Sequence, residues 1–223
     1  MRLYGTPPTR ALRPIWILNE LNLDCEIIPV DLPGGEHTEP LFLAINPFGK
    51  VPVLVDGELV VAESAAIPLY LAERYGGGRL IPTDIAERAL MHQWLFFLVT
   101  EIEQPLWRIA LHTAIYREDQ RRPAEIPLAK ADCLRMLAPL ERHMTDRSFL
   151  VGTSLTVADF VAAYTLDWAD ETQMLEVFPN LSAFVARMYR RADAPPTINE
   201  GFAALEAGCI AGRRRTDGPA TYA

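Results

Sequence analysis

The sequence predicts an α/β N-terminal unit followed by an all-helical unit. In residues 1–77, short apolar runs alternate with turn residues, which is typical of strands and helices interleaved as βαβ, a poorly defined stretch and then ββα. From Asp84 onward, apolar residues recur at helical spacing. The length of 223 residues suits one large or two small domains. We therefore expect domains at 1–77 and 88–210, a linker at 78–87 and a flexible tail at 211–223.

The first βαβ segment begins with a strand around Leu3–Gly5 and continues with a helix that starts near Ala11. Pro14 fits the first turn of that helix, where its missing N–H is not needed. A second strand is expected over Glu26–Asp31. Because Pro29 cannot donate a ladder hydrogen bond, this strand should lie at an edge of the sheet.

The second segment is a hairpin and a helix. Apolar runs at 51–55 and 59–61 flank Asp56-Gly57, a strong signal for a tight β-turn. A helix follows over Ser64–Arg74 and stops at the glycines 76–78.

The helical half should open with a long helix that bends near Pro105. Further helices are expected from Pro123, over Pro179–Arg191 and over Ile198–Cys209. Another begins after Thr156, with Asp159 placed to complete a capping box. We interpret that pair as a folding signal.

Charge and composition narrow the functional classes. The net charge of −8 is a poor match for nucleic acid, and no apolar run approaches the length of a membrane span. No secretory signal is evident at the N-terminus. The three cysteines are far apart, which indicates a reducing, cytoplasmic setting without structural disulfides. The histidines at 92, 112 and 143 show no metal-ligand spacing, so no metal is expected; the basic run 213–215 suits a solvated tail, and its role stays open.

Three motifs together resemble the cytosolic glutathione transferase family, in its bacterial, theta/phi-like, serine/threonine-type form. They are the stretch Asn46–Leu54, the pair Glu63-Ser64, and the segment Thr156–Asp159, in that order along about residues 1–205. The resemblance implies a thioredoxin-like N-terminal domain, an all-α C-terminal domain, glutathione as co-substrate and a homodimer. It also implies a transferase that adds glutathione thiolate to a small apolar electrophile, as in detoxification.

The resemblance further implies a glutathione-binding set. A cis Val51–Pro52 bond would turn the Val51 backbone toward an extended peptide ligand. Glu63 would pair with the γ-glutamyl ammonium, and Ser64 at a helix start would receive the adjacent carboxylate. His37 and Lys50 are candidates for the glycine carboxylate. The alternatives are a helix cap for Ser64, a loop residue for His37 and a solvated surface lysine for Lys50.

The thiolate is the nucleophile, so the thiol of glutathione must be activated. The family resemblance implies a donor for this purpose just after the first strand. The segment Thr6–Ala11 contains no cysteine, and Thr9 best matches the serine-type position of the family. Arg10 would add a positive field, and Thr6 is the second hydroxyl candidate. Thr9 also fits a helix-capping role.

The electrophile is not specified by the sequence. Family architecture implies a pocket between the domains, and the apolar candidates for its lining are Pro8, Trp107, Ile109, Leu111 and Tyr116. Two other functions stay open at this point. One is a glutathione-dependent disulfide reductase on the same fold, and the other is a non-catalytic interaction protein of the same family.

Overall fold

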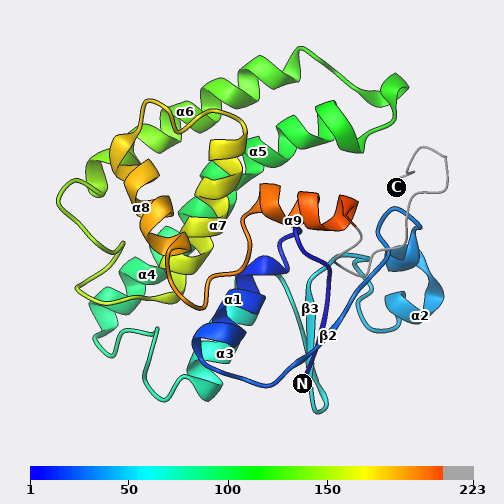
Figure 1. Ribbon diagram of the computed structural model, residues 1–223, viewed down its shortest axis with the longest axis horizontal. Coiled ribbons are helices and arrows are strands. Elements are labelled where there is room, and N and C mark those ends of the chain that lie inside the picture. The colour runs from blue at the N-terminus through cyan, green and yellow to red at the C-terminus, as the bar shows by residue number, and fades with distance from the viewer. Residues whose placement is uncertain (208–223) are drawn as a thin grey trace. The chain divides into compact units, whose positions relative to one another are not determined.

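The computed structural model describes residues 1–207, which form two compact units (Figure 1). The first unit contains residues 1–75 together with 193–207, and the second contains residues 76–192. The C-terminal residues 193–207 therefore group with the α/β unit, whereas the sequence analysis assigned them to the helical range 88–210. The expected tail at 211–223 and Cys209 lie outside the described residues.

A four-stranded mixed sheet forms the centre of the first unit. Its strands are β1 (Arg2–Tyr4), β2 (Glu26–Ile28), β3 (Val53–Asp56) and β4 (Leu59–Ala62), in the order β2-β1-β3-β4. β1 is parallel to β2 and antiparallel to β3, which is antiparallel to β4. The predicted edge position of β2 is confirmed, and this strand ends immediately before Pro29 because proline has no N–H to donate.

Two helices pack together in this unit. α1 (Leu12–Glu20) starts after Ala11, as predicted, and buries Trp16 and Ile17. α3 (Ala66–Tyr75) lies beside it (Figure 1). The unit therefore has the expected thioredoxin-like βαβ–ββα order.

The stretch that the sequence left undefined folds into two short helical segments. A 3₁₀ turn, η1, covers Glu36–Thr38, and a single-turn helix, α2, covers Pro40–Leu43. Phe42 of α2 joins Val30 and Val53 in a small apolar core. This packing fixes the segment, although its sequence carries no clear periodicity.

The β3–β4 hairpin is confirmed, with its turn displaced by one residue. Asp56 pairs with Leu59, so the two-residue turn is Gly57-Glu58 rather than Asp56-Gly57. Gly57 has a φ of 60°, a left-handed conformation that glycine adopts without steric cost.

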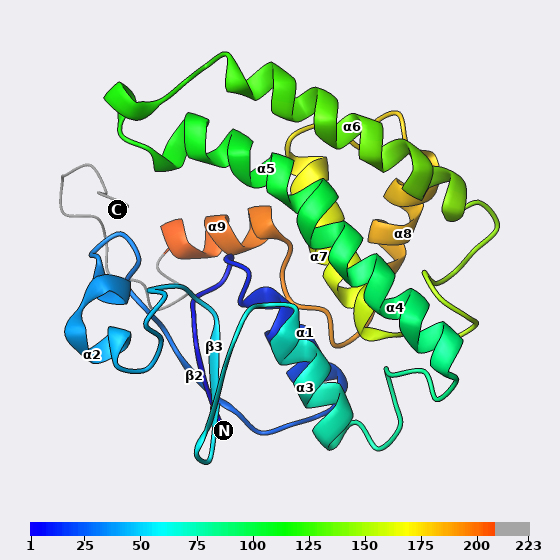
Figure 2. The same ribbon diagram turned by 180° about the vertical axis from the view of Figure 1, so that it is seen from behind.

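The second unit is all helical. Its α-helices are α4 (Ile85–Phe97), α5 (Glu103–Ala110), α6 (Glu125–His143), α7 (Val157–Glu171) and α8 (Pro179–Tyr189), and its shorter segments are η2 (Leu98–Ile102), η3 (Leu111–Ile115) and η4 (Glu118–Gln120). α7 is buried along most of its length, with α4, α5 and α8 packed against it (Figure 2). The N-cap Thr156 and the capping box with Asp159 are confirmed.

The long helix from α4 onward is interrupted near Pro105, as predicted, by a π-helical segment rather than by a simple bend. Pro105 lies in the first turn of α5, directly after η2. Proline cannot donate to the carbonyl four residues earlier, so the regular hydrogen-bond ladder breaks at this point. A second π-helical segment, η3, follows α5 and had no sequence signal.

Helix α9 (Ile198–Glu206) belongs to the first unit. Gly201 explains this grouping, because a Cβ added there would come 2.6 Å from the Cβ of Pro8. Only glycine allows α9 to approach the segment between β1 and α1 so closely (Figure 2). The sequence analysis did not anticipate this contact.

Candidate functional site

The sheet register brings three segments of the first unit to one end of the sheet. Tyr4 is paired with Val53, and Val53 is paired in turn with Ala62. The chain leaves β1 after Tyr4, enters β3 at Val53 and leaves β4 after Ala62. The loop with Thr9, the Val51–Pro52 bond and the Glu63-Ser64 pair therefore emerge from neighbouring strands.

Gly5 holds two of these segments close together. A Cβ at this position would lie 2.8 Å from the Cβ of Ala11 and 3.6 Å from the Cα of Pro52. A side chain here would push the start of α1 away from the entry to β3. Sequence reasoning did not single out Gly5, although a glycine at the end of a strand is a recognised sign of close backbone approach.

The Val51–Pro52 peptide bond is cis, as the family resemblance implied. A second cis bond joins Pro7 to Pro8, and the sequence analysis did not anticipate it. Within residues 1–207, neither the N–H nor the C=O of Val51 has a hydrogen-bond partner. Both groups are therefore available to pair with an extended peptide.

Glu63 and Ser64 lie at the start of α3, in different conformations and environments. Glu63 is exposed and has a φ of 74°, a left-handed conformation that is uncommon outside glycine and concentrated at functional sites. Its carbonyl accepts hydrogen bonds from the N–H groups of Ala66 and Ile67, both at 3.0 Å. Glu63 thus turns the chain from β4 into the helix with its carboxylate in solvent.

Ser64, in contrast, is buried, with 6% of its surface exposed. Its Oγ accepts a hydrogen bond of 2.9 Å from Nη1 of Arg13, on α1, and not from a helix N–H. The backbone N–H groups of Ser64 and Ala65 have no hydrogen-bond partner in the described part of the chain. The hydroxyl and the free donors at this helix start suit a carboxylate.

His37 and Lys50 are brought together as well. His37 is buried in η1, and Lys50 lies on the exposed loop that precedes Val51. Burial, and secondarily the charge of Lys50, lower the pKa of His37 below its ordinary value. His37 is therefore neutral at pH 7, and the positive charge at this corner belongs to Lys50.

Asn46 organises the loop that carries Lys50, and the sequence analysis gave it no role of its own. Its side-chain Nδ2 donates to the carbonyl of Lys50 at 2.8 Å, and its Oδ1 accepts from the N–H of Phe48 at 3.2 Å. The side chain is buried, so this loop is held from the inside. An asparagine before a proline is the signal that predicts such a turn.

The two hydroxyl candidates differ in their availability. Thr6 is buried, and its Oγ1 bonds both the N–H and the C=O of Val30, at 3.0 and 3.3 Å. Thr9 is half-buried; its hydroxyl donates to the carbonyl of Thr6 at 2.7 Å and accepts from the N–H of Ala11 at 3.3 Å. The Thr9 proton must rotate away from that carbonyl to reach a ligand. Arg10 is half-buried in the same loop.

Two cysteines are described, and neither forms a disulfide. Burial raises the pKa of the Cys133 thiol to about 12 and also raises the pKa of Cys25. Neither side chain is therefore a ready nucleophile. Within residues 1–207, no cluster of metal-binding side chains is found, and no helix is both long and apolar enough to span a bilayer.

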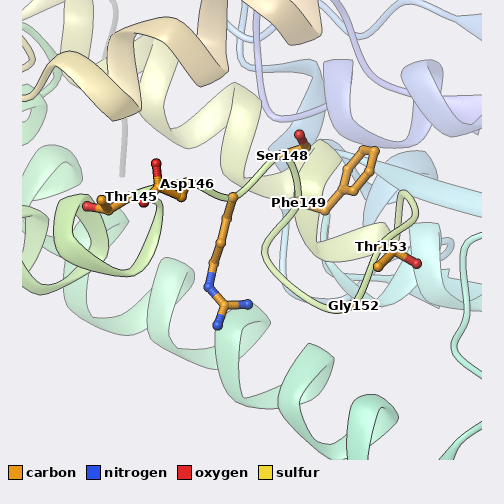
Figure 3. A pocket seen from close by; sticks show the side chains of 7 residues that line it. Thr145, Asp146, Ser148, Phe149, Gly152 and Thr153 are labelled. Carbon is orange, nitrogen blue, oxygen red and sulfur yellow. The ribbon is translucent and has the colours of Figure 1, made fainter.

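An open hollow of about 520 Å³ lies in the helical unit, lined by the segment that joins α6 to α7. Figure 3 shows Thr145, Asp146, Ser148, Phe149, Gly152 and Thr153 around it. No predicted site residue contributes to this hollow, and it contains no buried charged side chain aimed into it. The site residues all belong to the first unit instead.

Comparisons with protein families identify both units of the chain. Residues 1–73 match the glutathione S-transferase N-terminal domain, and residues 90–192 match the glutathione S-transferase C-terminal domain. The chain belongs to the glutathione S-transferase family. It is 32% identical over 164 residues to glutathione S-transferase F9 of Arabidopsis thaliana, covering 71% of this chain and 76% of the relative. It is 34% identical over 169 residues to glutathione S-transferase 3 of Zea mays, covering 71% and 73%.

Solved structures give the same assignment. Glutathione transferase F7 of Populus trichocarpa matches with a TM-score of 0.79 and 26% identity, over 90% of this chain and 98% of that one. Glutathione transferase URE2P6 of Phanerochaete chrysosporium, solved with oxidised glutathione, matches with a TM-score of 0.77 and 27% identity, over 92% and 96%. The chain is thus a glutathione S-transferase, and the disulfide reductase and interaction-protein alternatives are not favoured.

The residues expected to line an electrophile pocket in this glutathione S-transferase are divided between the units. Pro8 is buried in the first unit, beneath Gly201. Ile109 is buried within α5, and Trp107 meets Trp168 edge-on with ring centroids 6.4 Å apart. These contacts account for Ile109 and Trp107 as packing residues of the helical unit.

Proposed function

We propose that this glutathione S-transferase binds glutathione along the end of the sheet at Val51, Glu63 and Ser64, and adds its thiolate to a small apolar electrophile. The observation that carries the proposal is the row Tyr4–Val53–Ala62, which aligns the three loops on neighbouring strands. Relatives solved with glutathione derivatives support glutathione as the co-substrate. We place this activity in the cytoplasm and assign it to detoxification.

The γ-glutamyl end of glutathione carries an ammonium and a carboxylate on one carbon. The exposed carboxylate of Glu63 suits the ammonium, whereas the Ser64 hydroxyl and the N–H groups of Ser64 and Ala65 suit the carboxylate. Val51 then pairs with the cysteinyl backbone as a neighbouring strand does, because its N–H and C=O have no partner within residues 1–207.

Lys50 and His37 bind the glycine carboxylate of glutathione in this proposal. Lys50 supplies the positive charge, and neutral His37 supplies a ring hydrogen bond. Asn46 keeps the Lys50 loop in place. This division gives each end of the peptide its own anion site, with the thiol between them.

Thr9 and Arg10 are the proposed activating residues. A thiol near its ordinary pKa is only a few per cent ionised at pH 7, and lowering that pKa by about two units takes roughly 2.7 kcal/mol. Thr9 supplies a hydroxyl donor and Arg10 a positive field at the start of α1. With an aryl halide, the thiol proton passes to solvent, the sulfur forms a bond to the ring carbon, and halide leaves with its bonding electrons.

A homodimer is part of the proposal. Phe96 on α4 is 68% exposed, and Ile85 and Leu90 on the same helix are exposed as well. Trp94 and Phe97 contact one another and are half-buried. Phe96 is therefore the aromatic side chain of this group that a partner subunit would bury most. Sedimentation at micromolar concentration should give a dimer, and a Phe96→Asp variant should be monomeric. A monomeric wild-type protein would remove this part of the proposal.

The test of the function is conjugation of glutathione to 1-chloro-2,4-dinitrobenzene, followed by absorbance. We expect turnover in the wild-type protein, and a KM for glutathione about 10-fold higher in Glu63→Gln, which removes the charge but keeps the side-chain shape. Glu58→Gln changes an exposed glutamate on the hairpin turn, at the opposite end of β4 from the site; it is the matched control and should leave KM unchanged. Absence of conjugation, with turnover on a glutathionyl disulfide, would reject the proposed reaction.

A further inference from the structure

Arg13 is a buried arginine that contacts the proposed carboxylate site from beneath. It lies in α1 with 1% of its surface exposed, and its Nη1 donates to the Oγ of Ser64 at 2.9 Å. Arginine is almost never buried to this extent without specific partners. This contact joins α1 to the start of α3, between residues that are 51 positions apart in the chain.

The contact determines where the Ser64 proton points. A serine hydroxyl has one hydrogen to donate and two lone pairs that accept, whereas a guanidinium only donates. Arg13 therefore occupies one accepting position of the Ser64 oxygen, and the hydroxyl hydrogen must be donated elsewhere. No acceptor within residues 1–207 receives that hydrogen. The hydroxyl is thus prepared to donate to a ligand.

The nearby groups identify the chemical class of that ligand atom. The N–H groups of Ser64 and Ala65 have no partner in the described chain, and they lie in the same turn as the hydroxyl. A set of donors beside a guanidinium selects a negatively charged acceptor. A neutral or cationic group would leave the donors unpaired.

We infer that Arg13 is a positioning residue, which orients the Ser64 hydroxyl and makes this site selective for the γ-glutamyl carboxylate of glutathione. The inference rests on the proposed function. Arg13 itself does not contact the ligand; it acts through its hydrogen bond to Ser64. An apolar residue of similar size in α1 would fill the same space without orienting the hydroxyl.

The experiment compares two ligands by calorimetry: glutathione, and 4-aminobutyryl-cysteinyl-glycine, which lacks only the γ-glutamyl α-carboxylate. For Arg13→Met we expect glutathione to bind about 10- to 50-fold more weakly, while the affinity for the analogue changes less than about threefold. Arg13→Lys keeps the charge and should recover part of the selectivity. Arg187→Met, in the helical unit, is the matched control and should leave both affinities unchanged.

A double variant tests whether Arg13 acts through Ser64. In a Ser64→Ala background, Arg13→Met should weaken glutathione by less than about fivefold, because the hydroxyl that it orients is absent. Circular dichroism and urea denaturation establish that each variant is folded. If Arg13→Met does not fold, the ratio of the two affinities in Arg13→Lys decides the question. An unchanged ratio would overturn the inference.

The outcomes separate this inference from the proposed function. Equal losses for both ligands in Arg13→Met, or no loss for either, would make Arg13 a structural residue only. If wild-type protein binds the two ligands equally well, or if Ser64→Ala binds glutathione normally, the proposed carboxylate site itself is wrong. A large effect of Ser64→Ala with none for Arg13→Met rejects Arg13 alone.

Discussion

The starts of helices α3 and α7 use similar residues in different ways. At α7, Asp159 folds back and accepts hydrogen bonds of 2.8 Å from the N–H groups of Thr156 and Leu150 and one of 3.0 Å from the Thr156 hydroxyl. At α3, the Ser64 oxygen accepts a hydrogen bond from Arg13, and the N–H groups of Ser64 and Ala65, just before the helix, have no partner in the described chain.

The order of the residues explains the difference. In Thr156–Asp159 the acid lies three positions after the hydroxyl, the spacing at which each side chain reaches the backbone of the other. In Glu63-Ser64 the acid comes first and has a left-handed backbone, so it faces solvent and closes no box. The donors at the start of α7 are paired within the fold, whereas the N–H groups of Ser64 and Ala65 have no partner in the described chain and are the donors we propose for a ligand.

The largest effect is expected from Asp159→Ala at the start of α7. It leaves buried donors unpaired and removes the cap, so the free energy of unfolding should fall by about 3 kcal/mol. Urea denaturation measures this change, and Asp159→Asn should cost less because it keeps one acceptor. The glutathione affinity of the folded variant should be unchanged. A loss of stability below about 1 kcal/mol would show that the box is not important for folding.

Thr9→Val is expected to act mainly on the chemistry, with a smaller loss of stability because the Thr9 hydroxyl also bonds the carbonyl of Thr6 and the N–H of Ala11. Valine keeps the shape of the side chain but removes the hydrogen-bond donor, so the pKa of the thiol of bound glutathione should rise by about one to two units. The rate at neutral pH should then fall about 10- to 100-fold, with a much smaller change in glutathione affinity. The ultraviolet absorbance of the thiolate against pH measures the shift.

Two further variants complete this test. Thr9→Ser should retain most of the activity, because it keeps the hydroxyl. Arg10→Ala distinguishes a hydroxyl donor from a positive field. An unshifted titration in Thr9→Val, together with a large shift in Arg10→Ala, would transfer the role from Thr9 to Arg10.

Much of the fold was predictable because its signals are local. The edge position of β2 follows from Pro29, the hairpin from Gly57, and the α7 box from the Thr156–Asp159 spacing. Each depends on residues within one turn or one strand. The cis bond at Val51–Pro52 was predictable only through family resemblance, since an X–Pro bond alone does not determine its isomer.

The residues that sequence reasoning missed act across long separations. Arg13 contacts Ser64, Gly5 approaches Pro52, and Gly201 approaches Pro8. Apolar periodicity gives no information about such contacts, because they depend on how distant elements pack. Single glycines and a single arginine therefore looked ordinary until the sheet register was known.

The C-terminal end of α7 differs from its start, because its last residue, Glu171, is a half-buried carboxylate beside other acidic residues. Burial, and then the charges of Asp167 and Asp170, raise the pKa of Glu171 from its ordinary 4.5 to about 7. Between these pH values the folded protein takes up a proton that the unfolded chain lacks. The free energy of unfolding therefore falls as pH rises through this window. The ionised Glu171 at the C-terminal end of α7 therefore lowers the free energy of unfolding, whereas the capping box at the start of α7 raises it.

Glu171→Gln should remove the contribution of Glu171 to that pH dependence. Burial raises the pKa of Asp159 to about 6, so a contribution of the same sign remains. Because the Glu171 side chain is only half-buried, the expected gain in stability at pH 8 relative to pH 5 is about 1 kcal/mol, well below the full pKa shift. Urea denaturation of both proteins at the two pH values measures it. A wild-type protein whose stability rises across this window would contradict the argument.

The smallest effect concerns the other end of the ligand site. Lys50→Met removes a positive charge beside His37, so the pKa of His37 should rise toward its ordinary value, with burial still holding it below that value. Nuclear magnetic resonance of the ring protons against pH measures the shift. An unchanged titration would show that these side chains are not close enough to share one carboxylate.

Ser64→Ala distinguishes a ligand-binding role of the α3 start from the folding role that the α7 start has. Calorimetry with glutathione and urea denaturation are performed on the same preparation. We predict a dissociation constant raised about 10- to 100-fold and a free energy of unfolding lowered by no more than about 2 kcal/mol, because the buried Arg13 loses one acceptor. An unchanged dissociation constant with a clear loss of stability would contradict the account, because Ser64 would then be a helix cap.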